Sequence, residues 1–84
     1  MKHAGAEALA SLRGLLEELR RMEALKERSP GTFYRKSSAF LHFHEDPAGL
    51  FADVRIDGAW QRHRVSAAAE QGRLAKLIRA ALAR

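Results

Sequence analysis

The chain contains 84 residues, of which 15 are Lys or Arg and 10 are Asp or Glu, and its formal net charge at pH 7 is +5. This length accommodates one domain over residues 1–84, and the lack of cysteine excludes disulfides, thiolate zinc sites and cysteine nucleophiles. The positive charge favours acidic partners such as nucleic acid. No apolar run is long enough to cross a bilayer, and the first residues lack the apolar segment of a secretory signal, so we expect a cytoplasmic protein without a membrane partner.

The first predicted element is a helix over residues 4–28. Its leucines recur at spacings of three and four residues from Leu9 to Leu19, which is the period of an amphipathic helix. The tripeptide Ser29-Pro30-Gly31 is expected to end this helix, because the residue before proline leaves the α region and glycine permits a chain reversal.

From Thr32 to Ser66 the hydrophobic period changes to two, which predicts β-strands. We expect turns at Ser37-Ser38, at residues 45–49 (EDPAG) and at Asp57-Gly58, a dipeptide typical of type I′ hairpins. Four strands joined by three short connections predict an antiparallel meander.

Residues 67–83 are predicted to form the last helix, with Ser66 as its N-cap and a stripe of apolar residues between Leu74 and Leu82. The expected fold class is therefore α+β in the order α-β-β-β-β-α. We expect a four-stranded antiparallel meander sheet with the N- and C-terminal helices packed on one face, because two one-sided helices need one sheet face to cover.

Strand alternation predicts which side chains face these helices. The expected register pairs Phe43 with Ala52 and His42 with Asp53, because a slip of one residue would turn one apolar face outward. The helix-covered face is then expected to hold Tyr34, Leu41, Phe43, Leu50, Ala52, Val54, Ile56 and Val65.

The opposite face is expected to stay open and to carry aromatic, histidine and arginine side chains around Asp53. Monomers rarely expose large contiguous apolar areas and small domains gain stability by association, so the first interpretation of this face is a homodimer interface. The alternative is a platform for single-stranded or duplex nucleic acid, which uses aromatic and Arg side chains on open sheets. The candidate binding residues are Phe33, Arg35, Phe40, His42, His44, Phe51, Arg55, Trp60, Arg62 and Arg64.

A second alternative is a divalent metal site with His42, His44 and Asp53 as its candidates. Alternation directs both imidazoles to one side of the strand, as a metal site requires. A third ligand is needed, and the expected register places His63 on the other face. We expect His3 to lie in a frayed terminus. No catalytic motif or glycine-rich phosphate loop is present, which favours a non-enzymatic protein without a cofactor.

The order of the helix, the strands beginning TFYRKSSAFLHF and the closing helix LAKLIRAAL resembles small uncharacterised bacterial α+β domains of the YjbR type, whose fold is similar to that of frataxin. In those domains the first hairpin has two aromatic strands and a turn of small residues, which Phe33 to Phe43 matches. The resemblance implies a helix-backed sheet and the DNA-binding role suspected for some members. This chain is shorter, and it lacks both their later Lys-rich strand and the acidic first helix of frataxins, so iron handling is not implied and no site residue is carried over.

Overall fold

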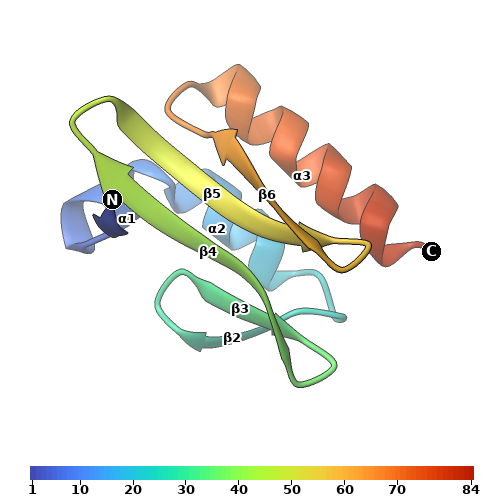
Figure 1. Cartoon of the computed structure of the whole chain (residues 1–84). Coiled ribbons are helices and arrows are strands. Elements are labelled where there is room, and N and C mark those ends of the chain that lie inside the picture. Colours follow the sequence, from blue (N-terminus) through green and yellow to red (C-terminus); the bar gives the residue numbers. More distant parts are fainter.

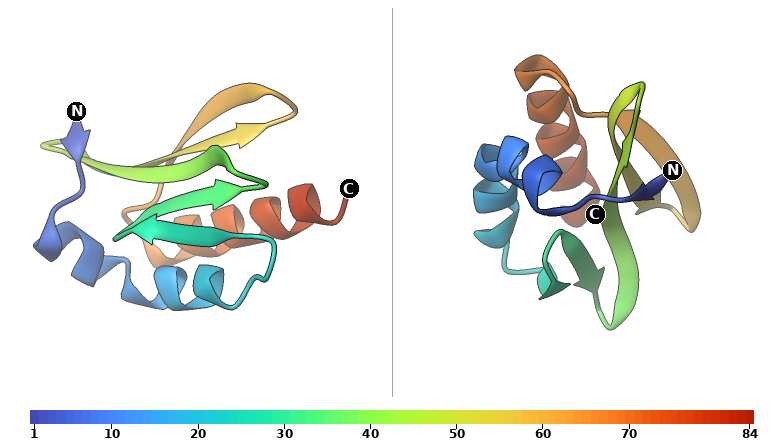
Figure 2. Two further views of the ribbon diagram at one scale, coloured as in Figure 1. Left: turned by 90° about the horizontal axis from the view of Figure 1, so that it is seen from below. Right: turned by 90° about the vertical axis from the view of Figure 1, so that its left-hand side faces the viewer.

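The computed structural model describes all 84 residues. The chain folds into a six-stranded antiparallel sheet with helices covering one of its faces (Figures 1 and 2). The helices are α1 (Ala6–Ser11), α2 (Arg13–Arg20) and α3 (Ala68–Leu82). The strands are β1 (Lys2–His3), β2 (Lys26–Ser29), β3 (Thr32–Arg35), β4 (Ser38–Asp46), β5 (Gly49–Ile56) and β6 (Ala59–Arg64).

The prediction of an α+β fold with an antiparallel sheet is confirmed, and β3 to β6 form the expected meander. Two strands were not predicted. β2 extends the sheet beyond β3, and β1 pairs with β4 in the antiparallel direction. The N-terminal helix is also a pair of shorter helices. No helix has the length and apolar character that spanning a membrane would require.

The prediction that one helix continues to residue 28 was wrong, because α2 ends at Arg20 and Lys26–Ser29 pairs with β3. The Pro30-Gly31 dipeptide is therefore a hairpin turn and not a helix terminator; Gly31 has a φ of 77°, which suits the second central position of a type II turn. Glu27 fixes this hairpin against α2. Its carboxylate accepts hydrogen bonds from Arg20 at 2.6 and 3.0 Å and from the Gly31 amide at 2.9 Å.

A bulge in β4 changes the faces predicted for the first hairpin. Phe33 pairs with Leu41 but Tyr34 pairs with Ala39, which leaves Phe40 without a partner. The consecutive residues Phe40 and Leu41 are accordingly both buried, as is Phe33. The predicted exposure of Phe33 and Phe40 was wrong, and so was the placement of Tyr34 toward the helices.

The turn of this hairpin also differs from the prediction. Its central residues are Lys36 and Ser37, with φ angles of 51° and 68°, as a type I′ turn requires. Arg35 consequently pairs with Ser38, whereas a turn at Ser37-Ser38 would pair it with Phe40, two residues further along. Alternation along β3 places Arg35 on the side of Phe33, where it is half-buried and its Nε has no hydrogen-bond partner.

The core lies between the sheet and the helices, and its buried side chains form one cluster. Leu12, Leu16 and Leu19 approach it from the N-terminal helices, and Leu74 and Ile78 from α3. An ion pair between Glu18 and Arg79 joins α2 to α3 at the surface.

The N-terminus of α3 is capped differently from the prediction. Ala67 is the N-cap residue, and its amide donates a hydrogen bond to the Glu70 carboxylate at 2.9 Å. The Ser66 hydroxyl instead accepts a hydrogen bond from the Leu50 amide at 2.9 Å, which ties the chain before α3 to β5.

We predict that Phe40→Ala lowers the free energy of unfolding by about 3–5 kcal/mol, the usual cost of removing a buried phenylalanine ring. Phe51→Ala removes a ring that is only half-buried and should cost clearly less. Urea denaturation followed by circular dichroism measures both changes. Equal losses for the two variants would contradict the inward position of Phe40.

Candidate functional site on the open sheet face

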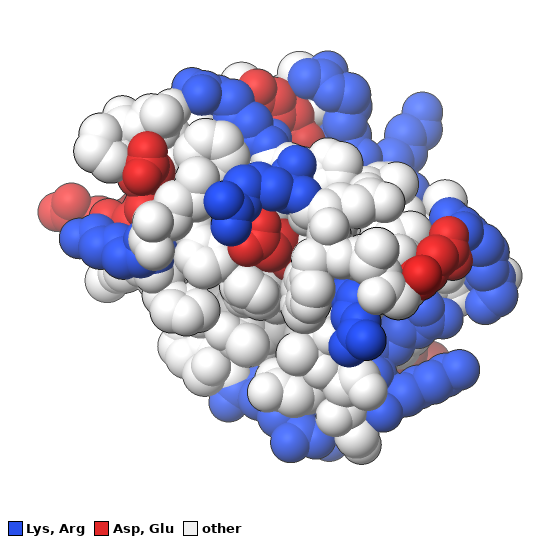
Figure 3. All heavy atoms as spheres, in the orientation of Figure 1, with Lys and Arg blue, Asp and Glu red and all other residues white.

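The face of the sheet opposite the helices is open and turns toward the viewer in Figures 1 and 3. Lys and Arg lie mostly around its margin, and uncharged side chains cover much of its middle (Figure 3). The predicted register across β4, β5 and β6 is confirmed: His42 pairs with Asp53 and Asp53 with Arg62, while Arg55 pairs with Trp60. Cross-strand partners share a face, so these side chains form one surface.

The remaining predicted residues of this surface are placed by the same pairing. His44 lies across from Phe51, and Phe51 lies across from Arg64. Trp60 is 47% exposed, and Met1 is the one other large hydrophobic side chain that is exposed. The open face therefore holds His42, His44, Phe51, Arg55, Trp60, Arg62 and Arg64, but not Phe33, Phe40 or Arg35.

Asp53 and Arg62 form the central ion pair of this face. Arg62 donates hydrogen bonds to Asp53 from Nε to Oδ1 at 2.8 Å and from Nη2 to Oδ2 at 3.0 Å. These bonds outweigh the burial of Asp53 and lower the pKa of its carboxyl group below the ordinary value. Asp53 is therefore an ionised carboxylate with a fixed orientation.

His44 lies between this carboxylate and His42. Its Nε2 is 3.1 Å from Asp53 Oδ2 and 2.9 Å from His42 Nδ1, while its Nδ1 is buried without a hydrogen-bond partner. A ring protonated on Nε2 fits these contacts, because its N–H points toward two acceptors, and its Nδ1 is then a buried acceptor without a partner. The two imidazoles and Asp53 are thus linked in one polar network.

His42 is kept neutral by its surroundings. The pKa of His42 is held below its ordinary value, mainly because the ring is partly buried. The repulsion that a charged His44 would exert is the second cause. Its ring also meets Trp60 edge to face, with the centroids 5.1 Å apart. A neutral His42 leaves Nδ1 with the lone pair that the contact with His44 requires.

His3 is the site residue that the sequence analysis missed. β1 pairs with β4 so that His3 lies across from His44, and their rings stack with centroids 5.0 Å apart. One ring nitrogen from each of His3, His42 and His44 lies within 4.8 Å of the others. A two-residue strand is too short to show any periodicity, so no sequence signal marked it.

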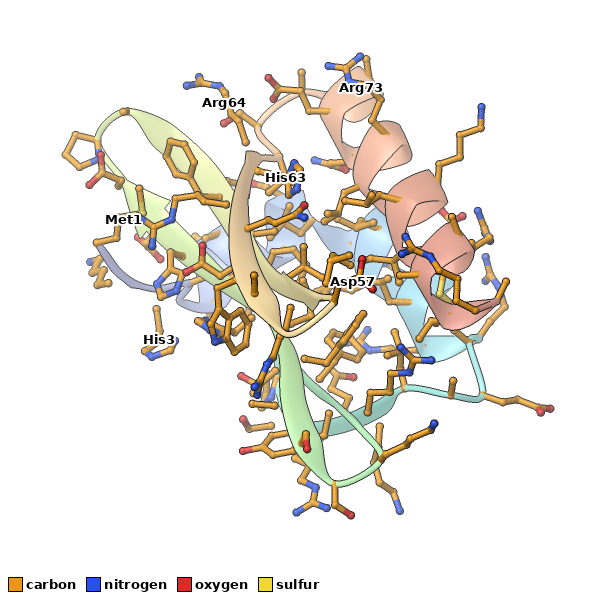
Figure 4. The ribbon with its side chains drawn as sticks, turned by 45° about the vertical axis from the view of Figure 1, so that its right-hand side comes forward. Met1, His3, Asp57, His63, Arg64 and Arg73 are labelled. Atoms are coloured by element: carbon orange, nitrogen blue, oxygen red, sulfur yellow. The ribbon has the colours of Figure 1, made fainter.

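His63 stands apart from this cluster. It points toward the start of α3, whereas His3 lies on the other side of β6 (Figure 4). Its Nε2 is 3.1 Å from the Gln61 side-chain oxygen. The predicted separation of His63 from His42 and His44 is therefore seen in the structure.

Two aromatic rings of the open face lie against basic side chains. The Arg28 guanidinium carbon is 4.7 Å from the centre of the Tyr34 ring, and that of Arg64 is 5.9 Å from the centre of the Phe51 ring. Arg64 is further held by a 2.8 Å hydrogen bond to the Ala48 carbonyl oxygen. Such contacts present a ring and a positive charge together.

The chain matches no known protein-family model, no curated protein and no solved structure. The resemblance to YjbR-type domains accordingly stays a prediction, and no residue of the site takes a role from it.

Acidification tests the environment of His42. Because the folded state disfavours its protonated ring, the unfolded chain binds more protons once the pH falls below the ordinary pKa of about 6.5. The free energy of unfolding should therefore fall between about pH 7.5 and the lowered folded-state pKa of His42. Urea denaturation across this range should show that the free energy of unfolding falls less in His42→Gln than in the wild type. In His63→Gln it should fall as much as in the wild type. Identical pH profiles for the wild type and His42→Gln would contradict the buried environment of this ring.

Proposed function

We propose that this chain is a non-enzymatic binding module whose open sheet face binds single-stranded nucleic acid. The observation that carries the proposal is the pairing of aromatic rings on the open face with basic side chains. Trp60 stands across from Arg55, in addition to the contact of Arg28 with Tyr34. Single-stranded nucleic acid needs both groups, because its bases stack on aromatic rings and its phosphates attract guanidinium groups.

The charges on the open face support an anionic ligand. Strand pairing and alternation assign more cations than carboxylates to it, and Asp53 is already neutralised by Arg62. Arg55 is exposed and makes no salt bridge within the chain, so its guanidinium is available for a phosphate. The cations are Lys26, Arg28, Arg55, Arg62 and Arg64, and the carboxylates are Asp46 and Asp53.

The positions of the rings favour a single strand over a duplex. Tyr34 and Trp60 lie on β3 and β6, three strand spacings or roughly 14 Å apart. Stacking on either ring needs a base whose face is free, and the bases of a duplex already stack on one another. An extended single strand that crosses the sheet meets this requirement.

We predict that Trp60→Ala weakens binding of a fluorescent oligo-dT at low salt roughly five- to hundredfold, because one base–ring stack contributes about 1–3 kcal/mol. Arg55→Ala should weaken binding and reduce its dependence on salt, because one phosphate contact is lost. Fluorescence anisotropy measures both effects.

Arg73→Ala is the matched control, since it removes one exposed charge from α3 on the helical side (Figure 4). It should leave the affinity nearly unchanged. No binding of any oligonucleotide at low salt, or an equal loss in Arg73→Ala and Arg55→Ala, would refute the proposed surface.

Self-association through the same face is the second candidate, and the exposure of Trp60 favours it. Burial of Phe33 and Phe40 leaves less apolar area for such a contact than the sequence suggested. This candidate predicts a dimer in sedimentation at high micromolar concentration that dissociates in Trp60→Ala. A wild-type monomer at that concentration excludes it.

A further inference from the structure

We propose that His3, His42 and His44 form a binding site for a divalent transition-metal ion. One nitrogen of each ring lies within 4.8 Å of the other two. Imidazole nitrogens suit Zn²⁺, Ni²⁺ and Cu²⁺, and three protein ligands leave coordination positions open to water or a further ligand. This site adjoins the proposed nucleic-acid surface, because the His42 ring contacts Trp60, but its ligands are imidazole nitrogens and not the Trp60 ring or the guanidinium groups.

The third ligand is held in place by the backbone around it. His3 is the strand partner of His44, and the next amide, that of Ala4, donates a hydrogen bond to the Phe43 carbonyl oxygen at 3.0 Å. The Gly5 amide then donates to the Glu45 carboxylate at 2.6 Å. These contacts hold β1 along β4 and keep the His3 imidazole beside the other two.

The distance between the first two ligands is close to what an ion requires. His42 Nδ1 and His44 Nε2 are 2.9 Å apart. Two nitrogens at about 2.05 Å from one ion are about 2.9 Å apart at a right angle and about 3.3 Å apart at the tetrahedral angle. The separation of these two nitrogens therefore matches octahedral Ni²⁺, and tetrahedral Zn²⁺ needs about 0.4 Å more. Both rings must turn so that their lone pairs point at the ion, and the His3 nitrogen, which lies within 4.8 Å of the others, must move closer.

The Asp53 carboxylate, which is paired with Arg62, lies next to the site. Asp53 Oδ2 is 3.1 Å from His44 Nε2. Each carboxylate oxygen has more than one lone pair, so Oδ2 can accept a hydrogen bond from Arg62 and still contact a second group. A cost opposes binding: when an ion occupies Nε2 of His44, the ring proton must sit on Nδ1, which is buried without a partner. The affinity is therefore expected to be modest.

The experiment uses the full chain without a polyhistidine tag, stripped of metal by a chelator that is then removed. Zn²⁺ and Ni²⁺ are titrated separately while the melting temperature is followed, and Co²⁺ is added to read ligand geometry from its visible absorption. An ion that binds the folded chain and not the unfolded one raises the melting temperature. We expect a rise of several degrees for at least one ion.

His3→Ala is the decisive variant, since His3 is exposed and its loss leaves the core intact. It should raise the dissociation constant by more than the roughly 10- to 100-fold cost of losing an outer-shell partner, and His42→Ala should do the same. His63→Ala, the matched histidine outside the cluster, should bind as the wild type does. Trp60→Ala should also keep metal binding, which separates this test from that of nucleic-acid binding.

Two results would overturn the site. One is a melting temperature that none of these ions raises; the other is a rise of equal size in the wild type and His3→Ala. A rise that disappears in His63→Ala but persists in His3→Ala would place binding elsewhere on the chain and would equally reject the three-histidine site.

Discussion

Backbone pairing on both edges of β4 holds the sheet and its open face together. One edge of β4 pairs with β3 as far as His42 and then with β1 at His44 and Glu45, while the other edge pairs with β5. Side chains from distant parts of the chain consequently meet on one face. His3 and Asp53 both approach His44 only because β4 has a neighbour on each side.

The bulge at Phe40 is the second feature with consequences for the whole molecule. It turns two consecutive side chains inward, so the core gains the rings of both Phe33 and Phe40. A chain of this size buries a limited fraction of its surface, and two large rings are a substantial part of its core. The same bulge places Tyr34 on the open face, where it meets Arg28.

The alternation of apolar and polar residues guided the prediction of the register of β4 against β5, where the two faces of each strand differ in chemistry. A slip of one residue would have turned one apolar set outward, so burying Leu41, Phe43, Ala52 and Val54 together fixed the register to within two residues. The register that we preferred also paired His42 with Asp53, as the structure does. The Asp57-Gly58 turn was equally clear, because positive φ at both central positions favours this dipeptide. In these segments the turn residues and the pattern of buried side chains predicted the same pairing.

The α+β class, the meander from β3 to β6 and the side chains that β5 and β6 present beside His42 and His44 follow from the sequence alone, because hydrophobic period and turn residues are local properties. The bulge at Phe40, the strand at Lys26–Ser29 and the position of His3 follow only from the folded chain. Each of these depends on a backbone partner elsewhere in the chain. A short polar segment becomes a strand when a neighbouring strand has unpaired amide and carbonyl groups to satisfy.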